Sequence, residues 1–125
     1  MFMPTVLIVD DSLFMRVAIG NMLNEWGFEI VGEASNGKDA VKLYEQLRPD
    51  LVTMDVTMPI MTGIEAVKHI VTIDPHANII MVTAIGQQKK IRAAIESGAK
   101  DFITKPFNPE QLKEVAINVL NMVRN

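Results

Sequence analysis

The chain contains no cysteine, so disulfides, cysteine-ligated zinc sites and thiol nucleophiles are all excluded. The absence of cysteine also fits a cytoplasmic protein, which is the location we expect. Basic residues form no block, and the 12 Lys and Arg residues are outnumbered by 15 Asp and Glu residues, which gives a net charge of −3. We therefore expect no binding to nucleic acid, because such binding requires a basic surface.

The chain also lacks any long uncharged run. Asp10 and Asp11 interrupt the first apolar segment, which argues against a signal peptide, and no uncharged stretch approaches the ~20 residues that span a bilayer. We expect no membrane association. The length of 125 residues suits one domain with one sizeable core. We expect a monomer with a single domain over residues 1–125, with no output domain.

Short apolar runs alternate with amphipathic stretches five times along the chain. The first run is Val-Leu-Ile-Val and the fourth includes Ile-Ile-Met-Val, and such continuously apolar runs are typical of strands buried on both faces of a parallel sheet. They cover residues Val6–Val9, Glu29–Ala34, Leu51–Met54, Asn78–Val82 and Asp101–Ile103. The pattern predicts an α/β fold of the (βα)₅ type, a five-stranded, doubly wound parallel sheet with helices on both faces.

The intervening stretches have the spacing of amphipathic helices. In the first, the residues expected to face the core are Phe14, Val17, Ala18 and Met22. In the last, they are Leu112, Val115, Ala116, Val119 and Val123. Helix starts are predicted from capping residues at Asn36, Thr62 with Glu65, and Asn108 before Pro109. Helix ends are predicted near Gly27, Pro49, Pro75 and Gly98.

Polar side chains collect at the carboxyl ends of four of the five predicted strands. Ligands of open α/β sheets bind beyond this edge, where the strand order reverses. The residues are Asp10 and Asp11 on the first strand, Asp55 on the third, Thr83 on the fourth and Lys105 on the fifth. The second strand ends in uncharged residues. If the first and third strands are neighbours, the three carboxylates converge.

Converging carboxylates need a cation. Two carboxylates about 5 Å apart repel each other by ~3 kcal/mol at an effective dielectric constant near 20. Oxygen ligands without histidine or cysteine are typical of Mg²⁺, which keeps several waters and accepts phosphate oxygens as further ligands. We therefore expect Mg²⁺ as the cofactor.

Each of these residues also has an ordinary structural explanation. Asp11 or Ser12 can cap the first helix, and for Ser12 we favour that explanation. Asp55 can begin a turn towards Pro59, Thr83 can be a β-branched strand residue, and Lys105 can be a solvated charge. Taken singly, these explanations are at least as good as the functional ones. Together they account poorly for the gathering of all four groups on one edge of one sheet.

A carboxylate nucleophile, a divalent metal, a hydroxyl and a lysine together make a site for phosphoryl transfer. An aspartate can attack phosphorus to form an aspartyl phosphate, while cations neutralise the equatorial oxygens. The chain has no GxxxxGK[ST] loop to hold ATP. The phosphodonor is therefore expected to be another phosphoprotein or a small phosphorylated molecule.

Several segments of the chain resemble the response-regulator receiver family. They are Leu7–Ser12, Met54–Pro59, Thr83–Ala84, Lys105–Phe107, Gly63 and Gly98–Asp101. The resemblance covers the whole chain, and it implies a flavodoxin-like sheet with strand order 2-1-3-4-5. Within the family, the stand-alone architecture and the segments 84–88 and 105–109 resemble the CheY-type chemotaxis regulators.

The resemblance also implies a role for each site residue. Asp55 is the expected phosphoacceptor, with Thr83 and Lys105 as the other catalytic residues that bind the phosphoryl group. The expected Mg²⁺ ligands are Asp10, Asp11, Asp55 and the carbonyl of Thr57. Thr83 and Phe102 are the expected switch pair, with Phe102 standing where many relatives have tyrosine. The bond before Pro106 is expected to be cis.

Three functions compete at this stage. The first is a diffusible switch that takes a phosphoryl group from a histidine kinase and binds the flagellar motor switch. Its phosphoryl group is then removed by hydrolysis, with or without a phosphatase. The second is a phosphorelay intermediate that passes the group to a second histidine protein. Neither is an enzyme acting on another substrate. The third, a phosphohydrolase of the haloacid-dehalogenase type, needs a second aspartate where this chain has Thr57.

Overall fold

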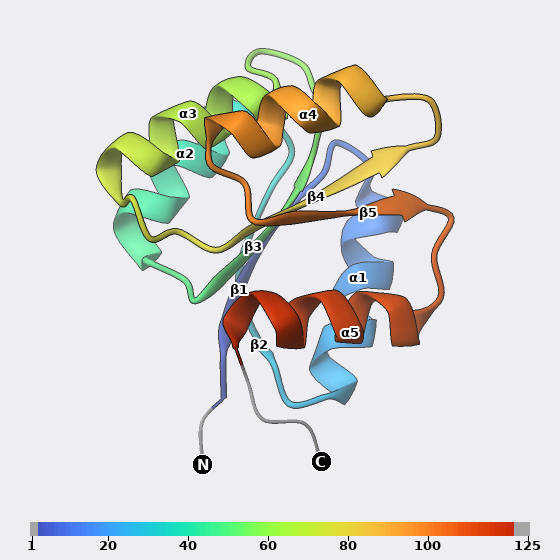
Figure 1. Ribbon diagram of the computed structural model, residues 1–125. Coiled ribbons are helices and arrows are strands. Elements are labelled where there is room, and N and C mark those ends of the chain that lie inside the picture. The colour runs from blue at the N-terminus through green and yellow to red at the C-terminus, as the bar shows by residue number, and fades with distance from the viewer. Residues whose placement is uncertain (1–2, 122–125) are drawn as a thin grey trace.

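The computed structural model describes residues 3–121, which form five strands alternating with five helices (Figure 1). The strands are β1 (Thr5–Val9), β2 (Glu29–Ala34), β3 (Leu51–Asp55), β4 (Ile79–Ala84) and β5 (Asp101–Lys105). The helices are α1 (Leu13–Glu25), α2 (Gly37–Leu47), α3 (Gly63–Ile73), α4 (Gln88–Ser97) and α5 (Pro109–Leu120). All strands are parallel, in the order β2-β1-β3-β4-β5. Both the predicted fold class and the strand order are confirmed.

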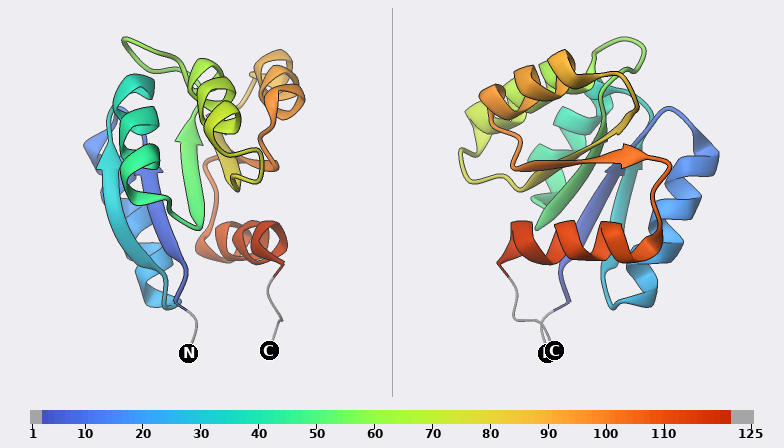
Figure 2. Two further views of the ribbon diagram at one scale, coloured as in Figure 1. Left: turned by 90° about the vertical axis from the view of Figure 1, so that its left-hand side faces the viewer. Right: turned by 45° about the vertical axis from the view of Figure 1, so that its right-hand side comes forward.

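The sheet lies between two layers of helices (Figures 1 and 2), with a hydrophobic cluster on each of its faces. Helices α2, α3 and α4 cover one face, and α1 and α5 cover the other. Successive residues of β1 alternate between the layers, since Leu7 and Val9 pack with the first group and Val6 and Ile8 with the second. Burial on both faces explains why the central strands β1, β3 and β4 are mostly apolar. Within residues 3–121, no helix has the length and apolar character needed to cross a membrane.

The predicted helix boundaries are confirmed by local hydrogen bonds. The side chain of Asn36 accepts a hydrogen bond from Asp39 N, at 2.8 Å. Thr62 and Glu65 form a reciprocal capping box, as do Asn108 and Gln111. At the other ends, Gly27 and Gly98 have positive φ values that suit glycine. These contacts join residues close in sequence, so sequence patterns could predict them.

Helix α1 corrects the sequence prediction. Phe14 is 78% exposed and Val17 is 50% exposed, whereas Ile19 and Leu23 are buried. Met22 is partly buried against the same layer, as predicted. Apolar residues occur on several sides of α1, so their spacing alone could not identify the inward stripe. Packing against the sheet selected it.

The expected ends of the fourth and fifth strands are correct to within one residue. Strand β5 ends at Lys105, and β4 ends at Ala84, so Thr83 is its last residue but one. Helix α5 ends at Leu120, where Asn121 adopts a left-handed conformation. The predicted core position Val123 lies outside the described residues.

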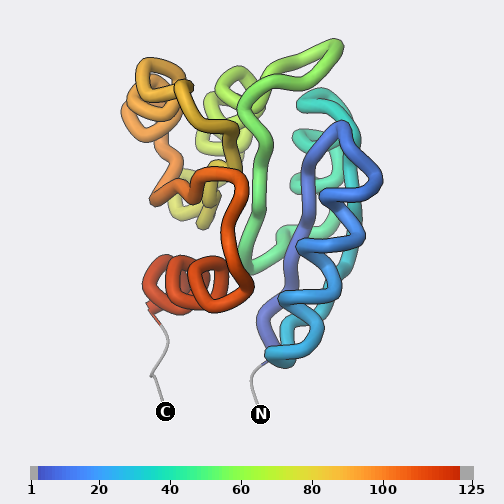
Figure 3. Tube along the Cα trace, turned by 90° about the vertical axis from the view of Figure 1, so that its right-hand side faces the viewer, coloured from blue at the N-terminus to red at the C-terminus, as the bar shows by residue number. Residues whose placement is uncertain are grey.

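The register brings the carboxyl ends of the strands to one edge of the sheet. Val9 pairs with Met54, Asp55 with Val82, and Ala84 with Lys105. Figure 3 shows that the β1–α1 and β3–α3 connections rise at the same end of the molecule. Residues far apart in sequence thus meet there.

Gly63 holds the loop after β3 close to the backbone of Asp55. Its amide donates a hydrogen bond to the carbonyl of Val56 at 2.8 Å. A Cβ atom at this position would lie 2.0 Å from the carbonyl oxygen of Asp55. The start of α3 therefore requires glycine.

We predict that Gly63→Ala lowers the free energy of unfolding by about 1–3 kcal/mol, because backbone atoms of Asp55 must shift. Gly20→Ala is the matched control. Its Cβ atom would lie at an ordinary 3.5 Å from Ile8 Cδ1, and alanine favours the helix by about 0.5–1 kcal/mol. Urea denaturation of the two variants tests this, and equal stabilities would contradict it.

Candidate phosphoacceptor and metal site

Three carboxylates converge at the carboxyl edge of the sheet. Asp10 and Asp11 follow β1, and Asp55 ends β3. One oxygen from each lies within 4.8 Å of the others. Asp10 is buried, Asp55 is partly buried and Asp11 is exposed. The sequence-predicted acidic cluster is therefore present, and it is open to solvent through Asp11.

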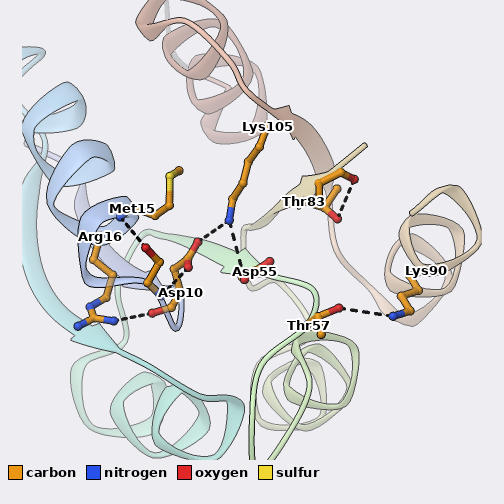
Figure 4. Close-up of polar contacts among 10 residues, drawn as sticks. Asp10, Met15, Arg16, Asp55, Thr57, Thr83, Lys90 and Lys105 are labelled. Atoms are coloured by element: carbon orange, nitrogen blue, oxygen red, sulfur yellow. Dashed lines mark hydrogen bonds and ion pairs between the residues drawn. The ribbon is translucent and has the colours of Figure 1, made fainter. Parts of the chain in front are cut away.

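Lys105 supplies the positive charge next to this cluster (Figure 4). From the end of β5, its Nζ atom lies 2.9 Å from Asp10 Oδ2 and 3.9 Å from Asp55 Oδ2. The following Lys105–Pro106 peptide bond is cis, as the resemblance implied. A single lysine thus faces two of the three carboxylates.

Asp10 is held by both its side chain and its backbone. Its Oδ1 accepts a hydrogen bond from Ser12 N at 2.9 Å, and its carbonyl accepts one from Arg16 Nη1 at 2.6 Å. Arg16 also forms an ion pair with Glu33, with Nε and Oε1 2.9 Å apart. Ser12 caps α1 through its hydroxyl, as expected. Sequence reasoning missed Arg16, because its contact depends on how α1 lies against β1 and β2.

The pKa of Asp55 is raised from 3.8 to about 6. Burial is the main cause, and the neighbouring charge of Asp10 adds to it, while Lys105 acts in the opposite direction. Near pH 6, Asp55 is therefore protonated in a large fraction of the molecules when no cation other than Lys105 is close. The pocket is short of positive charge.

The cluster has the donor set of a hard divalent cation. Its oxygens come from three carboxylates, and no histidine or cysteine contributes. Asp10, Asp11 and Asp55 can hold such an ion, and the donor chemistry fits Mg²⁺. Thr57, two residues beyond Asp55, is exposed, and its hydroxyl accepts a hydrogen bond from Lys90 Nζ at 3.4 Å. The role of the Thr57 carbonyl as a ligand stays a prediction.

Thr83 and Phe102 lie on neighbouring strands and differ in exposure. Thr83 is 1% exposed, and its hydroxyl makes a long 3.5 Å hydrogen bond to the carbonyl of Ala84. Phe102 is 42% exposed. It lines a groove of about 530 Å³ between α4 and β5, which we call the α4–β5 groove. Its other lining residues include Ala84–Gln88, Ile91, Arg92 and Ile95.

The raised pKa of Asp55 predicts an unusual pH dependence of stability. The folded state binds the Asp55 proton more tightly than the unfolded state, so this contribution is complete below about pH 4 and is lost as pH rises through about 6. Without divalent metal at pH 8, the free energy of unfolding of Asp55→Asn should therefore be about 1–3 kcal/mol higher than that of the parent.

Urea denaturation in EDTA between pH 4 and pH 8 measures this difference. The difference should shrink towards pH 4, where Asp55 is protonated in the folded state and about half protonated in the unfolded state. If the variant is no more stable than the parent at pH 8, the ionised Asp55 carboxylate does not destabilise the folded state.

Known proteins share the fold and much of the sequence of this chain. The model of the response regulator receiver domain matches residues 6–117. The chemotaxis protein CheY of Thermotoga maritima is 53% identical over 109 residues, which cover 87% of this chain and 91% of that protein. The CheY protein of Bacillus subtilis is 53% identical over 116 residues, covering 93% and 97%.

A solved structure extends the likeness to three dimensions. CheY in the CheX–CheY–BeF₃–Mg²⁺ complex of Borrelia burgdorferi matches with a TM-score of 0.89 and 34% identity. The match covers 96% of this chain and 90% of that one. The chain belongs to the response regulator receiver domain family, the signalling switches of two-component systems, and its relatives include CheY chemotaxis proteins.

Proposed function

We propose that this receiver domain takes a phosphoryl group from a histidine kinase onto Asp55. The observation that carries the proposal is the pairing of a partly buried Asp55 with Lys105 inside a cluster of three carboxylates. Asp55 is the nucleophile, and Lys105 neutralises charge on the phosphoryl oxygens. The Thr83 hydroxyl donates a hydrogen bond to one of those oxygens after turning inward.

The transfer exchanges one bond for another. An oxygen of ionised Asp55 attacks phosphorus, the bond from phosphorus to the kinase histidine nitrogen breaks, and the imidazole takes up a proton. Hydrolysis reverses the modification, because water attacks phosphorus and releases phosphate and the carboxylate. The protein thus catalyses only its own phosphorylation and dephosphorylation, and a phosphatase partner can speed the second step.

Mg²⁺ is the proposed cofactor, held by Asp10, Asp11, Asp55 and the carbonyl of Thr57. When bound, it neutralises charge on the carboxylates and on the phosphoryl oxygens. The shortage of positive charge at Asp55 supports this assignment. The Borrelia burgdorferi CheY complex, which holds both Mg²⁺ and BeF₃, supports it from a relative.

We predict that Asp55→Asn abolishes labelling by acetyl phosphate, because the amide is not a nucleophile. Omission of Mg²⁺ should have the same effect on the parent. The control is Asp101→Asn, which removes an equal charge at the opposite end of the sheet and should label like the parent. Intact-mass spectrometry measures the added phosphate, and full labelling of Asp55→Asn would contradict the assignment.

The proposed target is the flagellar motor switch. The proposed form of the protein is a single-domain monomer that diffuses through the cytoplasm to this target. The support is the similarity to CheY chemotaxis proteins and the apolar α4–β5 groove, which phosphorylation can reshape. Inward movement of Thr83 frees space that the exposed Phe102 ring can fill. A few kcal/mol between the two arrangements is enough for the phosphoryl group to shift their population.

We predict that Thr83→Ala accepts phosphate at Asp55 but transmits it poorly. The measurement is affinity for the motor switch protein with and without BeF₃⁻ and Mg²⁺. The parent should gain affinity, and the variant should lose most of that gain. An equal gain in Thr83→Ala would exclude this route. A parent that gains no affinity but passes its phosphoryl group to a second histidine protein would be a phosphorelay intermediate.

A further inference from the structure

Phosphorylation leaves the proposed site with too little positive charge, an inference that rests on the proposed function. With Mg²⁺ held by the three carboxylates and Lys105 beside them, the formal charges would be −3 from the carboxylates and +3 from Mg²⁺ and the lysine. An acyl phosphate on Asp55 carries a charge of up to about −2 in place of −1. The balance then falls short by about one positive charge in a partly buried pocket.

Two cationic side chains near the site already have other partners. Lys105 contacts Asp10 and Asp55, and Arg16 is occupied by Glu33 and by the carbonyl of Asp10. Arg16 contacts a backbone oxygen of the cluster and none of its carboxylate oxygens in the described bonds. The missing charge must come from another element.

Lys90 of α4 is placed to supply it (Figure 4). Its Nζ atom donates to the hydroxyl of Thr57, two residues beyond Asp55, at 3.4 Å. This hydrogen bond is long and exposed, and its acceptor is neutral. A phosphoryl oxygen would be a stronger partner, because hydrogen bonds between charged groups are shorter and about twice as strong. The flexible lysine stem permits the change of partner.

The beginning of α4 provides an independent reason. Helices α1, α2, α3 and α5 each have a side-chain N-cap hydrogen bond, whereas Gln87 provides none to α4. Lys89 and Lys90 lie in the first turn of α4, which has no acidic residue. Cations are unfavourable there, because the helix dipole is positive at its N-terminus. An anion close to Lys90 would offset the unfavourable positive charge at this end of α4.

We infer that Lys90 leaves Thr57 on phosphorylation and pairs with the phosphoryl group on Asp55. The pair neutralises the surplus negative charge and draws the first turn of α4 towards the site. Ile91 and Ile95 of the same helix line the α4–β5 groove. Lys90 thereby gives the site a second connection to the groove, separate from Thr83 and Phe102.

The test uses BeF₃⁻ as the phosphoryl mimic, because its complex with a carboxylate carries the same formal charge as an acyl phosphate. Calorimetric titration at saturating Mg²⁺ measures its affinity. Lys90→Gln should bind BeF₃⁻ about threefold to tenfold more weakly than the parent, and Lys90→Arg should restore most of the loss. The difference should shrink in high salt.

Lys89→Gln is the matched control, because it removes the same charge from a neighbouring exposed position on α4. It should bind BeF₃⁻ within about twofold of the parent. Backbone amide NMR provides a second readout, in which BeF₃⁻ should shift the signals of residues 88–91 in the parent far more than in Lys90→Gln.

The outcomes separate this inference from the proposed function. If Lys90→Gln binds BeF₃⁻ as Lys89→Gln does, or more tightly than the parent, Lys90 does not pair with the phosphoryl group, although phosphorylation of Asp55 stands. If the parent itself fails to bind BeF₃⁻ with Mg²⁺, the proposed function fails as well.

Discussion

Repulsion among three carboxylates at one edge of the sheet is the constraint on which the site depends. Asp10 is 1% exposed, and the burial of Asp55 beside it raises the pKa of Asp55 to about 6. Lys105 offsets only part of this charge. The cluster therefore destabilises the metal-free fold and at the same time favours the binding of a cation. Such strain is common where groups are arranged for chemistry rather than for stability.

The parallel sheet is what holds these groups together against their repulsion. Its central strands β1, β3 and β4 are buried between two helical layers and end at the same edge of the sheet. The backbone of Asp55 is further confined by Gly63, and that of Asp10 by Arg16. The apolar core thus supplies the stability that the acidic edge removes. The backbones of Asp10 and Asp55 can therefore be displaced little without disturbing these contacts.

Signal output is expected from the elements that are held least firmly. Helix α4 starts without a side-chain cap, after Gly86 in a left-handed conformation, and carries lysines at its positive end. Segments with few stabilising contacts are the ones that change conformation at low cost. The α4–β5 groove lies along this helix. A change in charge at Asp55 can therefore alter the groove while the sheet remains fixed.

Local patterns of residues were sufficient to predict the fold class, the strand ends and the chemical composition of the site. Continuous apolar runs, capping pairs such as Thr62 with Glu65, and polar residues at strand ends are local signals, and all were readable. Other features were decided only by the tertiary structure. These are the inward stripe of α1, the contacts of Arg16 and Lys90, and the raised pKa of Asp55. Each depends on how a helix lies against the sheet or on a distance between strands, and one-dimensional spacing contains neither.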